Sequence, residues 1–416
     1  MKQKVLRLVR HPLFSGSAVM IIGTNLNNVL SYLFHLFMGR MLGPAAYGEM
    51  AALFSLIILV STVPSSLSLA VIKFVSSAKN PDSLSRFMSL ILVWSGLVGG
   101  VITLLLLLFS RPLSSFLNLS SPVPVFIISW AFVFLLPSFA LKSALQGLLQ
   151  FNSYVVNILA ESGSKLLFGI LFVQIGWSVS GSISGILVST LIGLFIGYLY
   201  VSKTVRFAFP KFFPLGSFLR YSVPVMIYSL AGTSLFTTDL ILVKHFFSPF
   251  DAGTYAALST MGKIIIFGAG PVSGVMFPLV SRRHASHDHY RKIFWYGFAL
   301  TGAICLAVLA VYFAFPRFAV SLLYGHKYLQ AAGLLFPFGI FITLYTLSSF
   351  LVGFFLSVSY TRVVWITVLA AVAQIIGIFL FHSTIFSVIF VSIIVSLLLF
   401  LGLLAALKIK TAKILA

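Results

Sequence analysis

Pro44-Ala-Ala-Tyr-Gly-Glu-Met-Ala-Ala-Leu53 recurs half a chain later as Pro249-Phe-Asp-Ala-Gly-Thr-Tyr-Ala-Ala-Leu258. Five of the ten positions are identical at an offset of 205, which is almost half of the 416 residues. Many secondary transporters are built from two internal repeats of an apolar unit. The repeat therefore predicts two related lobes, residues 1–205 and 206–416, and it bears on function as well as on fold.

The composition of the chain requires a membrane. Sixty per cent of the residues are apolar and 8% are charged, a balance that soluble domains of this length do not have. Backbone groups in hydrocarbon must bond internally, so the spanning structure is either a helix bundle or a closed barrel. Continuous apolar runs such as Leu104-Leu-Leu-Leu-Leu-Phe109 exclude the alternating strands of a barrel. We therefore expect an all-α polytopic membrane protein.

The hydropathy pattern predicts about twelve transmembrane helices, six in each lobe. Of the 27 Lys and Arg residues, 20 fall on one side of this arrangement and five on the other, while Lys165 and Lys263 lie within spans. This asymmetry places the richer side, with both termini, in the cytoplasm. The expected spans are 16–38, 49–72, 87–110, 122–142, 153–175 and 180–202, then 218–243, 254–280, 292–315, 330–356, 362–381 and 384–407.

An even number of spans in each lobe fixes the expected symmetry. The second lobe starts on the same side as the first, so the two should be related by a pseudo-two-fold axis along the membrane normal. Two such lobes leave a cleft between them, which is the natural place for a substrate. The segment 202–216 is basic, aromatic and broken by proline, and we interpret it as a cytoplasmic linker on the lipid headgroups.

Two motifs resemble a known family. Gly39-Arg-Met-Leu-Gly-Pro-Ala-Ala-Tyr-Gly48 is similar to the G-R-x-L-G-x-x-x-Y-G element of bacterial polysaccharide exporters, in the multidrug/oligosaccharidyl-lipid/polysaccharide flippase superfamily. Thr238-Asp-Leu-Ile-Leu-Val-Lys244, followed by Gly253-Thr-Tyr255, resembles the counterpart in the second lobe. The resemblance implies a flippase that carries lipid-linked oligosaccharides across the cytoplasmic membrane of a bacterium for cell-surface polysaccharide biosynthesis.

Charged residues inside the expected spans are the candidates for chemistry, since a charge there is costly. Glu161 and Lys165 are four residues apart on one helix face, so they form either a self-satisfied ion pair or a proton- or substrate-sensing pair in the cleft. Asp239 lies near the outer end of its span and either pairs with Lys244 or binds a coupling cation. Lys263 lies about ten residues into its span, where it either snorkels to the interface or attracts a pyrophosphate.

The first helix of each lobe carries a polar stripe. Asn25, Asn28, Tyr32 and His35 share one face of the first helix, and Tyr228 lies on the corresponding face of the seventh. Such side chains either bond neighbouring helices together or line a cleft, where they suit a sugar by stacking and hydrogen bonding. We expect Asn25, Asn28, Tyr32, Lys165, Tyr228 and Lys263 to line the substrate cleft, with Glu161 and Asp239 as candidates for ion coupling.

Several other functions are excluded. The net charge of +21 marks membrane topology, so no nucleic-acid partner is expected. The sequence has no Walker element, nucleophile elbow or paired catalytic carboxylates, which argues against an enzyme and against a bound cofactor. His284, His287 and His289 sit in a basic loop and indicate a patch for anionic lipids rather than a metal site.

Two alternatives within the superfamily stay open. A cation- or proton-coupled drug exporter would need an accessible carboxylate, for which Glu161 or Asp239 would have to serve. A peptidoglycan-precursor flippase would share the preference for an anionic lipid. The expected partners are a lipid-linked glycan, membrane lipids, and a glycan polymerase or glycosyltransferases.

Overall fold

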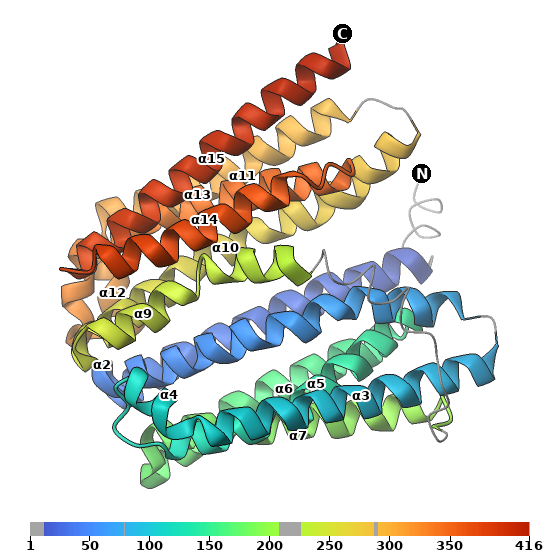
Figure 1. Cartoon of the computed structure of the whole chain (residues 1–416), viewed down its shortest axis with the longest axis horizontal. Helices are drawn as coiled ribbons and strands as arrows, with labels where there is room; N and C mark the ends of the chain where they lie inside the picture. Colours follow the sequence, from blue (N-terminus) through green and yellow to red (C-terminus); the bar gives the residue numbers. More distant parts are fainter. Residues whose placement is uncertain (1–11, 79, 208–225, 287–289, 416) are drawn as a thin grey trace, which may run out of the picture. The chain divides into compact units, whose positions relative to one another are not determined.

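The structure, a computed structural model, describes residues 12–78, 80–207, 226–286 and 290–415 (Figure 1). Nearly all of these residues are helical, and no strand occurs among them. Nine of the described helices are long and apolar enough to cross a membrane, and a tenth span is formed if one bent pair of helices is counted as one. The all-α membrane fold expected from the composition is confirmed.

Two of the nine helices are twice the length of a span. Helix α2 (Pro12–Ser77) is interrupted at Gly43, whose φ of 73° and ψ of 174° are not helical. Helices α6 (Phe151–Phe172) and α7 (Ser178–Ser202) are joined by a π-helical turn, Val173–Trp177, with a positive φ at Gly176. Counting each of these as two crossings, and the bent pair as one, would give the twelve predicted spans; the number of crossings stays a prediction.

The chain forms two compact units. Unit 1 comprises Met1–Leu42 and Val60–Met226, and unit 2 comprises Gly43–Leu59 and Ile227–Ala416. The lobes expected from the repeat, 1–205 and 206–416, differ from these units in that Gly43–Leu59 packs within unit 2 although it precedes most of unit 1 in the sequence. Most of the expected linker 202–216 lies outside the described residues.

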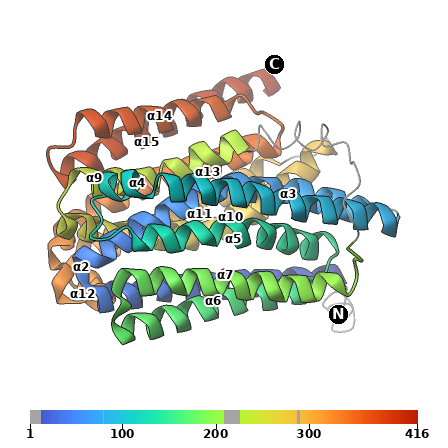
Figure 2. The ribbon, with the colours of Figure 1, turned by 60° about the horizontal axis from the view of Figure 1, so that its bottom comes forward.

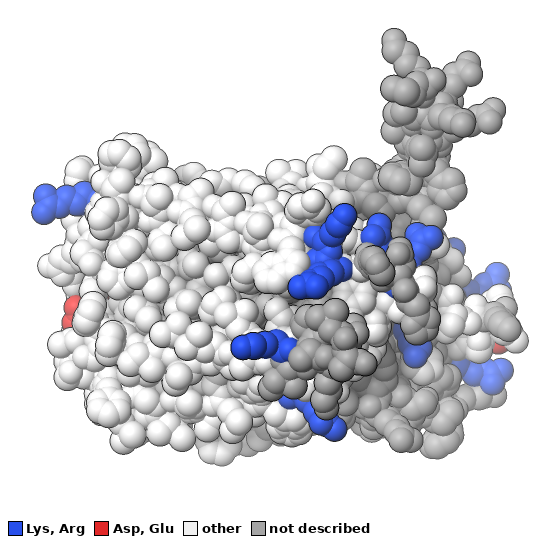
Figure 3. Space-filling view, turned by 90° about the horizontal axis from the view of Figure 1, so that it is seen from above, with Lys and Arg blue, Asp and Glu red and all other residues white. Residues whose placement is uncertain are grey.

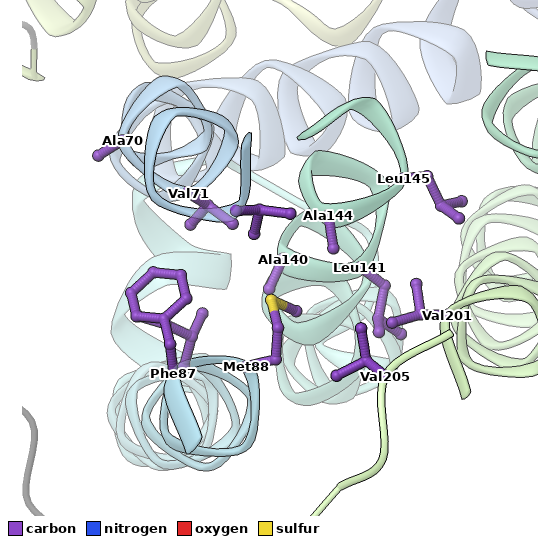
Figure 4. Close-up of a cluster of buried hydrophobic side chains, with 12 residues drawn as sticks. Ala70, Val71, Phe87, Met88, Ala140, Leu141, Ala144, Leu145, Val201 and Val205 are labelled. Carbon is purple, nitrogen blue, oxygen red and sulfur yellow. The ribbon is translucent and has the colours of Figure 1, made fainter. Parts of the chain in front are cut away.

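Unit 1 is a bundle in which each helix finds a partner beside it (Figure 2). Helix α5 (Val123–Gly147) packs against α3 (Pro81–Leu108) and α7, and α7 packs against α6. The short helix α4 (Ser110–Phe116) joins α3 to the segment before α5. A cluster of buried apolar side chains from α2, α3, α5 and the end of α7 fills the space between these helices (Figure 4).

Small residues on α7 allow it to approach α6 closely. A Cβ at Gly185 would lie 2.6 Å from the Gly169 nitrogen, and one at Gly193 would lie 2.7 Å from a carboxylate oxygen of Glu161. Without a hydrophobic force between helices in lipid, such close packing is a main source of helix association. The sequence of α7 therefore holds Glu161 beside a backbone rather than beside a side chain.

Unit 2 is built around α13 (Ala332–Ser357), which packs against α10 (Pro249–Ala285), α11 (Arg291–Ala314) and α15 (Ile385–Leu415). Helix α14 (Val363–Leu380) packs on α15, and α12 (Pro316–Tyr324) leads through the 3-10 turn His326–Ala331 into α13. Helix Met226–Ser234 and α9 (Thr238–Phe246) form the bent pair, with an angle of 44° between them. Local signals start α10, since the Ser248 hydroxyl accepts from the Asp251 N–H and Pro249 follows it.

The two copies of the repeated motif meet within unit 2. A Cβ at Gly48 would lie 2.7 Å from the nitrogen of Gly253, its counterpart in the repeat. A Cβ at Gly253 would in turn collide with the carbonyl of Pro44. Glycine is therefore required in both copies of the motif, at a point where two backbones touch.

Basic side chains gather at one end of the helices. In unit 2 they lie where α10 ends and α11 begins and where α14 begins, at Arg282, Arg283, Arg291, Lys292 and Arg362. On the face drawn in Figure 3, Lys and Arg cluster at one end beside a broad uncharged surface. This distribution matches the charge asymmetry used for the orientation, which itself stays a prediction.

Candidate functional site

A half-buried ion pair joins α5 to α6 inside unit 1. The Lys142 ammonium donates to a carboxylate oxygen of Glu161 at 2.8 Å, with 13% and 20% of the two side chains exposed. Gly193 on α7 leaves the space that the carboxylate occupies. The same ammonium lies 4.7 Å from the centre of the Phe139 ring, one turn earlier on α5. The pair is therefore held by three helices.

Lys165, one turn further along α6, completes this group. Its ammonium lies 3.3 Å from the Ser31 hydroxyl and 5.3 Å from the centre of the Phe34 ring, both on α2, and it interacts electrostatically with Glu161. We call Lys142, Glu161 and Lys165 the charged cluster. Two lysines and one glutamate give it a formal charge of +1.

The expected partnership of Glu161 with Lys165 needs correction. The ion pair that the structure shows for Glu161 is with Lys142, while Lys165 reaches towards α2. The expected fourth span ends at Lys142, which places this lysine at the membrane surface, whereas α5 continues to Gly147. Lys142 is the last residue of the expected span, and a lysine within a span was the signal that sequence reasoning missed.

Uncharged polar side chains support the charged cluster. Asn157, one turn before Glu161, is fully buried and donates from Nδ2 to the Gly193 carbonyl at 2.8 Å. Its Oδ1 has no hydrogen-bond partner in the described part of the chain. The Ser162 hydroxyl donates to Asn27 of α2. A line of polar groups thus runs along α6 from Asn157 to Lys165.

The cluster lies at depths where hydrocarbon is expected. At 1.5 Å per residue, Lys142 is roughly 8 Å from the end of α5, while Glu161 and Lys165 are roughly 15 and 21 Å from the start of α6. Charges at such depth are typical of substrate or ion pathways. A group with one excess positive charge and buried hydroxyl and amide groups suits an anion that also accepts hydrogen bonds.

The polar stripe expected on the first helix faces another direction. Gly23, Ser31 and Phe34 are the positions of α2 that contact α6, together with Asn27. Asn28 lies roughly a third of a turn away from that contact face, and Tyr32 and Asn25 lie nearly half a turn away from it. Asn25 is exposed and its amide donates to the Ile21 carbonyl of its own helix at 2.8 Å, while Asn28 and Tyr32 are half-buried. Their role in a cleft stays a prediction.

Asp239 is enclosed in unit 2. Its side chain is 1% exposed, and its two oxygens accept from the Tyr255 hydroxyl at 2.7 Å and from the Leu240 N–H at 2.8 Å. Tyr255 belongs to the second copy of the repeated motif. The carboxylate therefore ties α9 to α10, and its proposed ion coupling would require these bonds to open.

The other predicted residues of unit 2 lie near this carboxylate or on neighbouring helices. Lys263 is half-buried, interacts electrostatically with Asp239, and places its ammonium 5.9 Å from the centre of the Phe54 ring. Tyr228 is half-buried and interacts electrostatically with Tyr345 of α13. In unit 2 the structure thus places Lys263 near Asp239, and in unit 1 it places Lys165 near Glu161.

Two further polar contacts in unit 2 were not anticipated. The Tyr47 hydroxyl lies 2.8 Å from that of Thr260 and 3.1 Å from that of Tyr324, so the first copy of the motif is bonded to α10 and α12. Glu49, in the first copy of the motif, is buried and interacts electrostatically with the buried Lys244. Only the folded chain brings these residues together.

No metal site occurs in the described part of the chain, where no three His, Cys, Asp or Glu side chains come together. Of the histidine loop considered above, residues 287–289 lie outside the described residues. Cys305 is buried as a free thiol.

Two bundles of apolar helices with charged groups inside them define a multi-pass membrane protein, and solved transporters share its fold. A multidrug resistance MATE family transporter of the MOP superfamily, inward-facing, matches with a TM-score of 0.74 and 15% identity over 92% of this chain and 95% of that one. The lipid II flippase MurJ, in an inward closed conformation, matches with a TM-score of 0.75 and 15% identity over 93% of this chain and 87% of that one. A MOP superfamily transporter from Pyrococcus furiosus matches with a TM-score of 0.66 and 17% identity over 98% of both chains.

The family follows from the sequence itself. The model described as "Polysaccharide biosynthesis protein" matches residues 13–284, well over half of the chain. The chain belongs to this polysaccharide biosynthesis family, which confirms the family resemblance found in the two motifs. A search of curated protein sequences gives no significant match.

Proposed function

We propose that this protein is a flippase that moves lipid-linked oligosaccharides across the bacterial cytoplasmic membrane for cell-surface polysaccharide biosynthesis. The observation that carries the proposal is the charged cluster in a member of the polysaccharide biosynthesis family. A polyprenyl pyrophosphate head is anionic and accepts hydrogen bonds, and an excess positive charge with neighbouring hydroxyl groups complements it. The lysines would attract the head, and Glu161 would hold Lys142 in place when no substrate is bound.

The same contacts weigh against a cation-coupled drug exporter. A carboxylate that binds a cation must be accessible, yet Asp239 is buried and accepts two hydrogen bonds, and Glu161 is paired with Lys142. Glu49 is also buried beside Lys244. The three acids of the helix interiors therefore serve contacts within the protein, which favours an anionic substrate. A peptidoglycan-precursor flippase remains the nearest alternative, because its substrate carries the same head chemistry.

The proposed mechanism is alternating access of the two lobes. The anionic head and its sugars enter a polar path from the cytoplasm while the lipid tail stays in the bilayer, and the lobes then reorient. An ion gradient, the membrane potential or consumption of the product would drive the cycle, since moving one charge through 100 mV is worth about 2.3 kcal/mol. The expected partners are glycosyltransferases, acting before translocation, and a glycan polymerase, acting after it.

Reconstituted vesicles test this proposal. Flux of a lipid-linked glycan should exceed that of a cationic dye, and Lys142→Gln, Lys165→Gln and Lys263→Gln should each slow it by about tenfold, as for lost hydrogen bonds to a charged group. Lys203→Gln is the matched control, since Lys203 is exposed just after the end of α7. Wild-type flux in all three variants, or faster transport of the dye, would refute the proposal.

A further inference from the structure

We propose that an apolar pocket in unit 1 binds the isoprenoid chain of the lipid-linked substrate; this rests on the function proposed above. The pocket has a volume of about 210 Å³ and lies between the second half of α2, α3 and α5. Its walls include Pro64 and Leu67 of α2, Trp94 and Val98 of α3, and Phe139 and Ala140 of α5.

The walls of the pocket are almost entirely apolar. Three serines line the pocket, Ser68, Ser95 and Ser143. The Ser95 hydroxyl donates to the Leu92 carbonyl at 2.9 Å and the Ser143 hydroxyl donates to the Phe139 carbonyl at 2.7 Å. Hydroxyl groups bonded to their own helix present mainly carbon to the cavity. Val71, Ile91 and Ala140 line the pocket and also belong to the buried apolar cluster, in which Figure 4 labels Val71 and Ala140.

The pocket opens towards lipid. Helix α3 is the least buried of the nine candidate spans. Trp94 and Val98 are 49% and 45% exposed, and Leu97 and Val101 continue the same exposed apolar surface. A ligand can therefore enter sideways from the bilayer, without crossing a polar surface.

The size of the pocket suits a segment of a branched chain. An apolar cavity of about 150 Å³ accommodates benzene, so this one holds roughly one to two five-carbon isoprene units. Along α3 it extends from Ile91 to Ile102, at roughly 15 to 31 Å from the start of the helix. It therefore holds a short stretch of a longer chain, deep in the hydrocarbon region.

A positive charge beside the pocket favours an anionic lipid over a neutral one as its ligand. Phe139 lines the pocket, and the Lys142 ammonium lies 4.7 Å from the centre of its ring. The ammonium is nearer the end of α5 than most of the pocket is, as the head of a cytoplasm-facing lipid would be. A molecule with an apolar tail in the pocket and an anionic head at the charged cluster matches both sites, and the substrate proposed above has this form.

Photo-crosslinking tests the proposal in full-length protein reconstituted in phosphatidylethanolamine and phosphatidylglycerol vesicles. The probe is a polyprenyl phosphate with a diazirine on its isoprenoid chain, compared with phosphatidylglycerol carrying the same group on an acyl chain. We expect the polyprenyl probe to label peptides of α2, α3 and α5 that line the pocket. Unlabelled polyprenyl phosphate should compete, and excess phosphatidylglycerol should not.

The matched variants are Val98→Trp, at the mouth of the pocket, and Val101→Trp, one turn further on the exposed side of α3. Val98→Trp should reduce labelling by at least about fivefold, because overfilling a packed site is unfavourable, and Val101→Trp should leave it unchanged. If Val98→Trp does not fold, Ser95→Leu, in the same wall, replaces it.

Three outcomes separate this inference from the proposed function. Equal labelling by the phospholipid probe, or undiminished labelling in Val98→Trp, overturns the isoprenoid pocket. Glycan flux without labelling of the pocket overturns the pocket alone and leaves the proposed function standing. Labelling that Val98→Trp abolishes, in vesicles that show no glycan flux, supports the pocket and overturns the proposed function.

Discussion

Gly253→Ala tests the close approach of the two repeat copies. The added methyl would collide with the Pro44 carbonyl, a backbone atom that cannot rotate away. Overfilling a packed site costs typically about 1–3 kcal/mol, and a backbone clash should lie at the upper end. Alanine also favours a helix over glycine by about 1 kcal/mol, which partly offsets the loss.

A second glycine in the same helix isolates the effect. Gly270, also in α10, has open space where its Cβ would be, so Gly270→Ala gains the helix preference without a clash. The difference between the variants then reports the clash alone, about 3 kcal/mol. For the roughly 200 residues of unit 2, this predicts a melting temperature lower by about 6–12 °C in Gly253→Ala than in Gly270→Ala.

The assay is thermal unfolding in detergent, followed by circular dichroism on monodisperse samples of both variants. Melting temperatures within about 1 °C of each other would show that the two backbones do not constrain each other. If Gly253→Ala does not fold, Gly48→Ala provides a milder test, because its Cβ would lie 2.7 Å from the Gly253 nitrogen.

Three further predictions concern polar contacts. Glu161→Gln should destabilise the protein by about 3 kcal/mol in chemical denaturation, since it leaves Lys142 without its carboxylate. The double variant Glu161→Gln/Lys142→Met should recover part of this loss, whereas additive losses from the two changes would contradict the pairing. Tyr47→Phe should cost about 1–2 kcal/mol in the same assay by removing its hydroxyl contacts, and an unchanged midpoint would argue against them. Asp239→Asn keeps an acceptor for Tyr255, so glycan flux in vesicles should stay near wild type; loss of flux in a folded variant would identify Asp239 as an ion-coupling residue.

Much of the fold could be predicted from local sequence. The apolar runs required helices because an unsatisfied backbone cannot lie in hydrocarbon. Some helix starts also depend on local sequence alone, since Asn80 and Ser248 each cap a helix whose first residue is proline. The candidate site was predicted only in part. Lys165 and Glu161 were recognised as charges inside a span, but the ion pair of Glu161 with Lys142 of α5 was not predicted.

The sequence by itself determined that the chain is a duplicated, helical membrane protein with a few charges among apolar spans. Helical periodicity predicts which residues of one helix share a face, but it does not predict which other helix packs against that face. Tertiary structure alone decided that Glu161 meets Lys142 across α5 and α6, that Asp239 is held by Tyr255, and that Gly43–Leu59 packs in unit 2 against the other copy of its motif. These choices depend on which helix surfaces fit together, and residues distant in sequence contribute to that fit.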